Sequence, residues 1–278
     1  MSIHYLNGKF VEEKDLLISP RDLGFSRGYA VFDFFVTYQG GRPFMLERHI
    51  DRFFNSAGCI ELSFPWSKEE VTRCVMETLA RNADGTEKGV KIGLTGGVSD
   101  SLMPSPDAAT LMILVDDRHY FPSEMYENGV KAITVEHARY APEAKTNNYI
   151  EGVRQVQNAE RVGAIEPVYY DHRQVFEGAI SNVFALIDGQ LVTSKTNILP
   201  GITREVLLDI LKLEVPVLAK DFTIDELRSA SELFFAGSNK EVMPITRVDG
   251  NLVGHGTPGP ITKEAMRQFR EFTLGDRW

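Results

Sequence analysis

Cysteine is scarce in this sequence, with only Cys59 and Cys74 among 278 residues. The two residues form neither a CxxC motif nor part of a spaced Cys/His cluster, which argues against a disulfide scaffold and against a structural zinc site. The six histidines are scattered and lack metal-ligand spacing, so the sequence predicts no metal centre.

Long apolar runs are also missing. The most apolar stretch, residues 109–115, is too short to cross a bilayer. The N-terminus has no basic segment that leads into an apolar core, as a secretory signal peptide has. We therefore expect a soluble cytoplasmic protein.

The chain has no excess of positive charge, because 30 basic residues stand against 39 acidic ones and give a formal net charge of −9. Such a chain binds duplex DNA and anionic membranes poorly, although a local basic pocket for a small anion is compatible with it. Walker A, G-x-S-x-G and H-E-x-x-H motifs do not occur. A G-x-G-x-x-G match at 254–259 lies close to the end of the chain, so we interpret it as the entry to the last helix.

The rest of the composition is typical of a globular protein, and the length suits one large domain or two smaller ones. Hydrophobic periodicity and turn dipeptides predict a mixture of strands and helices in two halves, with a boundary within 116–128. In the first half we predict a hairpin at 3–10 that turns at Asn7-Gly8, strands at 29–38, 89–95 and 109–115, and helices at 48–58 and 69–82. In the second half we predict strands at 130–137, 167–170, 183–187 and 232–235, helices at 149–162, 203–212, 224–230 and 262–272, and hairpins at Asp188-Gly189 and Asp249-Gly250.

Lys145 has an unusual position, between a predicted strand and the helix that starts near Tyr149. A cation near a helix N-terminus is electrostatically unfavourable, and this field lowers the pKa of the amine. Imine chemistry needs a neutral amine, so Lys145 is a candidate for it, the alternative being an ordinary exposed lysine.

Several segments are suited to binding an anion. Residues 199–204 open a helix, where free N–H groups and the Thr203 hydroxyl could hold a phosphate. Residues 236–241 follow an apolar strand and could form a second anion-binding loop, and Arg52 could bind a phosphate with two hydrogen bonds. The alternatives are a plain helix start, an ordinary turn and a solvated arginine.

Glu177 lies among apolar residues in 175–184. A buried carboxylate there needs a cationic partner, and a protonated pyridine nitrogen would serve. The alternative is an exposed turn glutamate.

Four motifs in this order resemble those of class IV aminotransferases, which are pyridoxal-phosphate enzymes of fold type IV. They are Arg52 in Glu-Arg-His-Ile-Asp-Arg-Phe, Lys145 in Ala-Lys-Thr-Asn-Asn-Tyr, Glu177 in Glu-Gly-Ala-Ile-Ser-Asn-Val-Phe, and Gly201-Ile202-Thr203-Arg204. The resemblance covers nearly the whole chain. It implies a two-domain α+β fold, with a small N-terminal α/β domain at 1–118, a linker at 119–127 and a larger pseudo-barrel domain that binds the cofactor at 128–278. It also implies a homodimer.

The same resemblance implies roles for individual residues. Lys145 would form the Schiff base with pyridoxal 5′-phosphate and move the proton between Cα and C4′, and Glu177 would pair with the pyridine nitrogen. Tyr149 would lie at the cofactor's phenolic oxygen. The remaining cofactor residues, most of them at the phosphate, would be Arg52, Leu199, Gly201, Ile202, Thr203, Ser238 and Asn239.

The expected substrate site departs from that of the best-known D-amino acid aminotransferases, which hold the carboxylate with a tyrosine and an Arg-x-His loop. Phe32 occupies the place of the tyrosine, and the loop 97–104 lacks the Arg-x-His sequence. Arg27 and Lys91 could supply the missing positive charge, as in a less usual group of these enzymes, and Arg139 is another possible partner of the carboxylate.

We therefore expect transfer of the amino group of a D-amino acid, such as D-alanine or D-glutamate, to a 2-oxo acid such as 2-oxoglutarate or pyruvate. A branched-chain L-amino acid aminotransferase is the main alternative, because Phe32, Phe34 and Met103 could form an apolar side-chain pocket. An (R)-amine transaminase, an aminodeoxychorismate lyase and a phosphate-binding module without activity are further alternatives.

Overall fold

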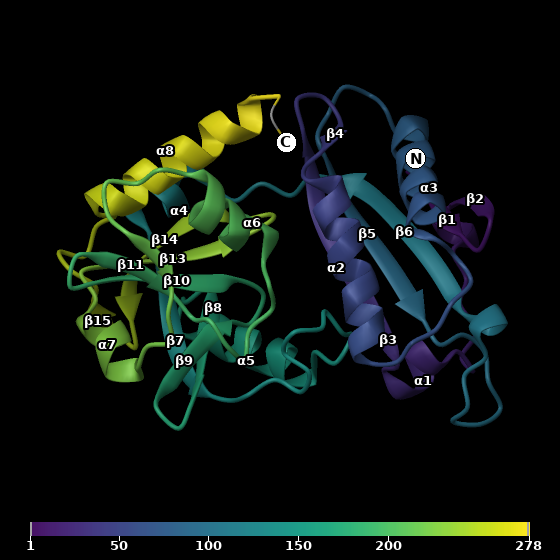
Figure 1. Ribbon diagram of the computed structural model, residues 1–278, viewed down its shortest axis with the longest axis horizontal. Coiled ribbons are helices and arrows are strands. Elements are labelled where there is room, and N and C mark those ends of the chain that lie inside the picture. Colours follow the sequence, from purple (N-terminus) through teal and green to yellow (C-terminus); the bar gives the residue numbers. More distant parts are fainter. Residues whose placement is uncertain (1, 277) are drawn as a thin grey trace. The chain divides into compact units, whose positions relative to one another are not determined.

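The computed structural model describes residues 2–276 and 278. These residues form two units, each with its own sheet and apolar core (Figure 1). The first unit contains residues up to His119, together with Glu143–Asn148 and Trp278, and the second contains the rest. The predicted domain limits stay a prediction, and they differ from this division into units at Glu143–Asn148. This segment belongs to the first unit because Thr146 forms a β-bridge with Val31.

The first unit contains an antiparallel sheet of six strands among its described residues, in the order β2-β1-β6-β5-β3-β4. Its strands are β1 (Ile3–Leu6), β2 (Lys9–Glu12), β3 (Ala30–Tyr38), β4 (Arg42–Pro43), β5 (Lys88–Thr95) and β6 (Thr110–Asp117). Its helices are α1 (Leu23–Arg27), α2 (Leu46–Cys59) and α3 (Lys68–Arg81), with short 3₁₀ turns at Glu13–Asp15 and Pro106–Ala108. The predicted hairpin, long strand and two long helices of the first half are confirmed.

Helices α2 and α3 lie side by side on one face of this sheet (Figure 1). Both are amphipathic, and the buried side chains of Phe53 on α2 and Val75 on α3 belong to the same core as Val31 and Phe35 of β3. Full burial of one such side chain stabilises the fold by about 1.5–3 kcal/mol. This packing fixes α2 against β3, and these two elements carry the predicted Arg52 and Phe32.

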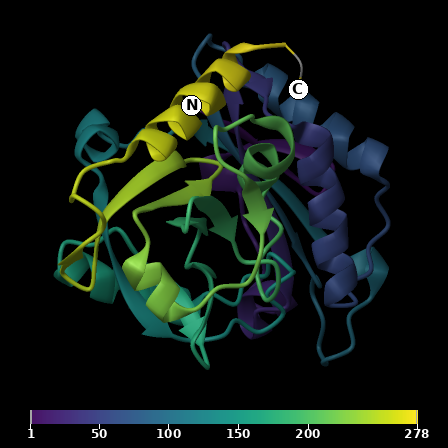
Figure 2. The ribbon, with the colours of Figure 1, turned by 60° about the vertical axis from the view of Figure 1, so that its left-hand side comes forward.

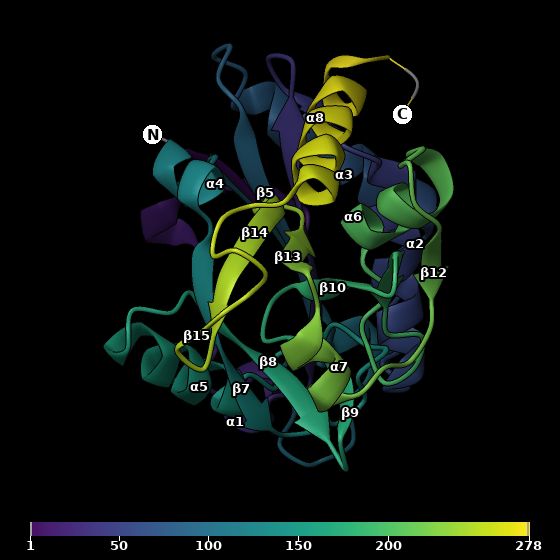
Figure 3. The ribbon, with the colours of Figure 1, turned by 90° about the vertical axis from the view of Figure 1, so that its left-hand side faces the viewer.

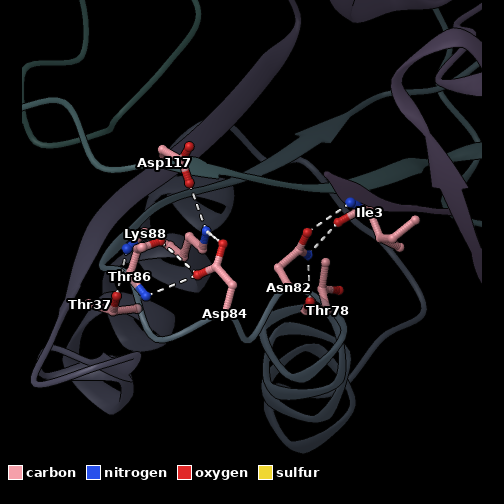
Figure 4. Close-up of polar contacts among 8 residues, drawn as sticks. All are labelled: Ile3, Thr37, Thr78, Asn82, Asp84, Thr86, Lys88 and Asp117. Atoms are coloured by element: carbon pink, nitrogen blue, oxygen red, sulfur yellow. Dashed lines mark hydrogen bonds and ion pairs between the residues drawn. The ribbon is translucent and has the colours of Figure 1, made fainter. Parts of the chain in front are cut away.

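Polar contacts at the C-terminal end of α3 tie the helix to the sheet (Figure 4). Asn82 accepts a hydrogen bond from Ile3 N at 2.8 Å and donates one to Ile3 O at 2.7 Å. The buried Lys88 amine pairs with Asp84 at 2.8 Å and with Asp117 at 2.7 Å. These contacts anchor β1 and the first residue of β5, the strand that pairs with β3.

The second unit contains a mixed sheet of nine described strands. Eight of them follow the order β12-β11-β10-β13-β14-β7-β8-β9, and β15 pairs with β14. The strands are β7 (Val130–Glu136), β8 (Glu166–Asp171), β9 (Gln174–Gly178), β10 (Asn182–Ile187), β11 (Gln190–Thr193), β12 (Val217–Ala219), β13 (Glu232–Gly237), β14 (Glu241–Val248) and β15 (Asn251–Leu252). The helices are α4 (Ser123–Asn128), α5 (Ile150–Arg161), α6 (Ile202–Glu205), α7 (Ile224–Ser229) and α8 (Pro260–Leu274), and a π-helical turn occupies Val206–Ile210.

This sheet curls back on itself. Strand β9 is at one end of the hydrogen-bonded order, yet a tight connection joins it to β10, with a bond of 2.7 Å from Gly178 N to Ser181 O. One face of the sheet packs around Phe235 and the other stacks Phe184 on Phe234, with 4.9 Å between the ring centroids. Helix α8 covers β13 and β14 (Figures 2 and 3). The predicted pseudo-barrel is thus confirmed.

Several details differ from the prediction for the second half, among them β12, which was not predicted. The predicted linker 119–127 contains most of α4, which packs against β14. The predicted helix 203–212 is interrupted after Glu205, where the backbone widens into the π-helical turn closed by Leu211 N and Val206 O. Strand β9 was not predicted, because four of its five residues are buried and the alternation that marks a strand is hidden.

Within the part of the chain that the structure describes, none of the helices has both the length and the apolar character needed to span a bilayer.

Candidate active site

In the first unit, the alternation of β3 places Val31, Asp33 and Phe35 on the buried face under α2. Asp33 is therefore a carboxylate in an otherwise apolar layer. Helix α2 brings a cation to it: the Arg52 guanidinium donates from Nε to Oδ2 and from Nη2 to Oδ1, both at 2.8 Å. Burial alone would raise the pKa of Asp33, but the charges and hydrogen bonds of Arg52 and His49 lower it well below its usual range.

Lys145 is positioned by its backbone. Its carbonyl accepts a hydrogen bond from Phe32 N at 2.9 Å, and its amide donates to Ser56 Oγ on α2 at 3.1 Å. The Lys145 ammonium lies 4.7 Å from the centroid of the Phe32 ring. The expected effect of a helix N-terminus on the pKa of Lys145 stays a prediction.

Lys91 approaches the same ring. It pairs with Phe34 across β3 and β5, and its amine also lies 4.7 Å from the centroid of the Phe32 ring. Burial lowers the pKa of Lys91. Two amines, those of Lys91 and Lys145, thus flank one aromatic side chain, and an anion near them would be stabilised.

Arg27 is exposed in the last turn of α1. Gly28, which has a φ of 71°, ends this helix in the left-handed region that favours glycine. The guanidinium of Arg27 donates to Ser26 O at 2.8 Å. The side chain is therefore accessible to a ligand, and its predicted role in carboxylate binding stays a prediction.

In the second unit, Glu177 is buried on β9 with an exposed fraction of 4%. Its Oε2 accepts hydrogen bonds from Leu199 N at 3.0 Å and from Asn182 Nδ2 at 3.2 Å, and its Oε1 pairs with Arg139 at 2.5 Å. Arg139, considered above as a partner of the substrate carboxylate, is instead a partner of Glu177 in this structure. These contacts favour the anionic form of Glu177.

Apart from Arg52, the predicted phosphate residues lie at two places in the second unit. Gly201 precedes α6, so the amides of Ile202 and Thr203 have no acceptor within the helix. A Cβ on Gly201 would lie 1.9 Å from Asn182 Oδ1, which leaves no room for a larger residue. Helix α6 also packs against β13, the strand that leads into the turn with Ser238 and Asn239.

Asn239 and Tyr149 complete the predicted cofactor set. The side-chain oxygen of Asn239 is buried and has no hydrogen-bond partner among the described residues. Because an Asn amide can turn over, its nitrogen could donate to an anion from the same place. Tyr149 is half-buried immediately before α5.

Sequence reasoning missed three residues of this arrangement, namely Asp33, His49 and Asn182. A signal existed for the first, because a single acidic residue interrupts the apolar run Val31-Phe32-Asp33-Phe34-Phe35. His49 precedes Arg52 by one helical turn and so lies on the same face of α2. Among the described residues, no group of three or more His, Cys, Asp or Glu side chains could hold a metal ion.

Comparisons with known proteins identify the family of the chain. The family described as amino-transferase class IV matches residues 30–248. A D-alanine aminotransferase from Staphylococcus haemolyticus is 31% identical over 274 residues, which cover 96% of each chain. A putative branched-chain-amino-acid aminotransferase from Methanocaldococcus jannaschii is 34% identical over 277 residues, which cover 96% of this chain and 95% of the relative.

Solved structures give the same result. A branched-chain amino acid aminotransferase from T.th., solved with pyridoxamine 5′-phosphate, has a TM-score of 0.90 and 27% identity, covering 99% of this chain and 95% of that one. The branched-chain aminotransferase of Thermoproteus uzoniensis with norvaline has the same TM-score and identity, with 99% and 96% covered. The chain therefore belongs to the class IV aminotransferases, pyridoxal-phosphate enzymes of fold type IV, as its motifs predict.

Proposed function

We propose that this protein transfers the amino group of a D-amino acid, such as D-alanine or D-glutamate, to a 2-oxo acid such as 2-oxoglutarate or pyruvate. The observation that carries the proposal is the pair of amines at Phe32: Lys91 lies beside the same ring as Lys145. A cation near the reacting amine suits a substrate with a carboxylate next to its amino group. The D-alanine aminotransferase relatives support the choice of stereochemistry.

The described residues fit pyridoxal 5′-phosphate. Glu177 is an anionic group for the pyridine nitrogen, and the amides of Ile202 and Thr203 would hold the phosphate. The resemblance to the family also gives Arg52 a role at the phosphate. The unpartnered oxygen of Asn239 fits a place where a ligand completes the hydrogen bonding. The expected contacts of Ser238, and of Tyr149 at the phenolic oxygen, belong to the same proposal.

In this arrangement, each protein group has a defined task. The cofactor, when bound, supplies an aldehyde that takes up the amino group and a ring that withdraws electrons from the substrate Cα. The Lys145 amine removes the proton from Cα and returns it at C4′. Glu177 keeps the proton on the pyridine nitrogen, because Arg139, Asn182 and Leu199 hold its carboxylate in the charged form. Arg27 and Lys91 bind the substrate carboxylate.

A branched-chain L-amino acid is the second candidate substrate. The relative from Methanocaldococcus jannaschii and the two solved structures above are named for this activity. Phe32 and Phe34 lie on the same face of β3, where they could contact an apolar side chain. We also propose, from the resemblance, that the protein works as a cytoplasmic homodimer; light scattering should give a mass near twice the 31.2 kDa of one chain.

Steady-state transamination with variants tests the proposed carboxylate site. Arg27→Ala and Lys91→Met should each raise KM for D-alanine by about 10-fold or more, and should change KM for (R)-1-phenylethylamine, which lacks a carboxylate, by less than about 2-fold. Arg21→Ala is the matched control, because Arg21 lies close to Arg27 in the sequence and pairs with the exposed Asp100. Equal effects on both substrates would contradict the assignment.

A further inference from the structure

The proposed function uses Arg52, but it gives no task to the two buried groups that contact it. Asp33 and His49 each have an exposed fraction of 0%, and Arg52 has one of 7%. All three lie between β3 and α2 in the first unit. Ionic and polar groups as deeply buried as these need a reason.

Stability alone does not supply this reason. A buried ion pair loses in desolvation much of what it gains in attraction, so apolar residues of the same volume often stabilise a core equally well. The neighbours of Asp33 on its face of β3, Val31 and Phe35, show that apolar residues fit this layer. A charged group at this position serves better to orient the side chain that it contacts than to stabilise the fold.

The geometry sets a direction for Arg52. Its guanidinium meets Asp33 side-on, with Nε at Oδ2 and Nη2 at Oδ1, and two parallel hydrogen bonds fix the plane of the group. The Nη1 corner of the guanidinium therefore lies away from Asp33. A phosphate held by Arg52 would be bound from this side.

Two further contacts, with Phe34 and His49, fix the Asp33 carboxylate. Its Oδ1 accepts a hydrogen bond from Phe34 N at 2.7 Å, and His49 Nδ1 lies 2.7 Å from the same oxygen. Since the carboxylate is anionic and accepts only, His49 donates from Nδ1. The other ring nitrogen of His49, Nε2, is buried and has no hydrogen-bond partner among the described residues. The ring packs on Phe35, with 5.3 Å between the centroids, and its Nδ1 faces Asp33.

We propose that Asp33, held in place by His49, is the positioning residue that aims the guanidinium of Arg52 at the cofactor phosphate, and that this buried group gives the enzyme its preference for pyridoxal 5′-phosphate over pyridoxal. The inference rests on the proposed function, because it assumes that Arg52 binds the phosphate. Asp33 also offsets the charge of Arg52, so the selectivity comes from the direction of the hydrogen bonds rather than from a general positive field.

The Asp33→Asn variant tests this inference. Its amide has the shape of the carboxylate, but one oxygen becomes an NH₂ group that faces an N–H of Arg52 and repels it. The dissociation constants of pyridoxal 5′-phosphate and of pyridoxal are measured by equilibrium dialysis of the full chain. The constant for the phosphate form should rise by about 10-fold or more, and that for pyridoxal should change by less than about 2-fold.

Two further comparisons separate positioning from a general loss of structure. Asp51→Asn, also on α2, removes a carboxylate that pairs with Lys68 at the surface, and it should leave both constants unchanged. His49→Asn keeps a donor near the place of Nδ1 and should retain the preference for the phosphate form, whereas His49→Leu should lose it. If Asp33→Asn fails to fold, the comparison of His49→Asn with His49→Leu decides whether Arg52 must be positioned for the preference to exist.

The outcomes distinguish this inference from the proposed function. If the wild-type chain prefers pyridoxal 5′-phosphate and the Asp33→Asn and His49→Leu variants keep the full preference, the positioning role is wrong while the cofactor assignment stands. If the wild-type chain does not bind pyridoxal 5′-phosphate at all, the proposed function itself is wrong.

Discussion

The backbone of Lys145, the lysine that we propose forms the Schiff base, makes hydrogen bonds that fix the position of the residue. The hydrogen bonds of its backbone to Phe32 and Ser56 fix the residue beside β3 and α2. The amine is thereby held near the Phe32 ring. Placement by the backbone is compatible with the proposed role, in which the Lys145 amine changes its bonding during the reaction.

Replacement of Lys145 by Ala should abolish transamination and leave the fold intact, because the backbone contacts remain. The absorbance band of the bound cofactor above about 400 nm, which depends on the lysine imine, should also disappear. Absorbance spectra and activity are compared with those of Lys14→Ala, which removes an exposed lysine. Turnover by the Lys145→Ala variant would refute the assignment.

Glu177→Gln should retain the cofactor but slow the reaction by about 10-fold or more, because a neutral amide does not keep the pyridine nitrogen protonated. The change also leaves Arg139 without its anionic partner at 2.5 Å. Loss of one member of a buried pair costs about 3–5 kcal/mol, so urea unfolding should show a clear loss of stability. An unchanged kcat would rule out the role of Glu177 at the ring.

At the level of elements, hydrophobic periodicity predicted β3 and α2 but not how the helix packs on the strand. The alternating pattern of 29–38 and the helical pattern of 48–58 are local signals, and both are confirmed. The pairing of Asp33 with Arg52 depends on the packing of the helix on the sheet, which the sequence pattern does not contain. For the same reason β9, which is buried on both faces, and the π-helical turn after Glu205 escaped prediction.

The start of α6 allows a prediction for the phosphate site. A Cβ on Gly201 would lie 1.9 Å from Asn182 Oδ1, so Gly201→Ala must displace either the helix start or the Asn182 side chain. Asn182 also donates to Glu177 and to Leu199 O. The variant should therefore bind pyridoxal 5′-phosphate about 10-fold more weakly or worse, as measured by equilibrium dialysis. Gly189→Ala, in an open turn, controls for the loss of a glycine, and equal affinities would contradict this view of α6.

The contact between β3 and α2 should also affect the pH dependence of stability. The pKa of Asp33 is lowered in the folded state, since burial is outweighed by the charges and hydrogen bonds of Arg52 and His49. The unfolded chain therefore binds more protons at this carboxyl than the folded chain does, and the stabilisation is present above about pH 4 and lost as the pH falls further. Urea unfolding between about pH 5 and pH 3 should show a steeper loss for the wild type than for Asp33→Asn. Equal slopes would contradict the account.

At the level of the whole molecule, the order of four short motifs predicted the family and the fold type, and the comparisons confirm both. Motif order identifies a fold because each motif is tied to one element of it. Assignment of Glu143–Asn148 to the first unit could not be predicted, because it depends on the bridge between Thr146 and Val31, which are far apart in the sequence. Substrate choice was the least predictable property, since in our proposal it depends on a few side chains such as Arg27 and Lys91.

The most direct test of the central claim is a half-reaction with the cofactor-loaded protein. D-alanine, D-glutamate, L-leucine and (R)-1-phenylethylamine are added in turn, without an acceptor, and the absorbance band above about 400 nm is followed as the cofactor changes to its amino form. We predict rapid conversion with the two D-amino acids and slow conversion with the other two compounds. Rapid conversion with L-leucine and none with the D-amino acids would contradict the proposed substrate.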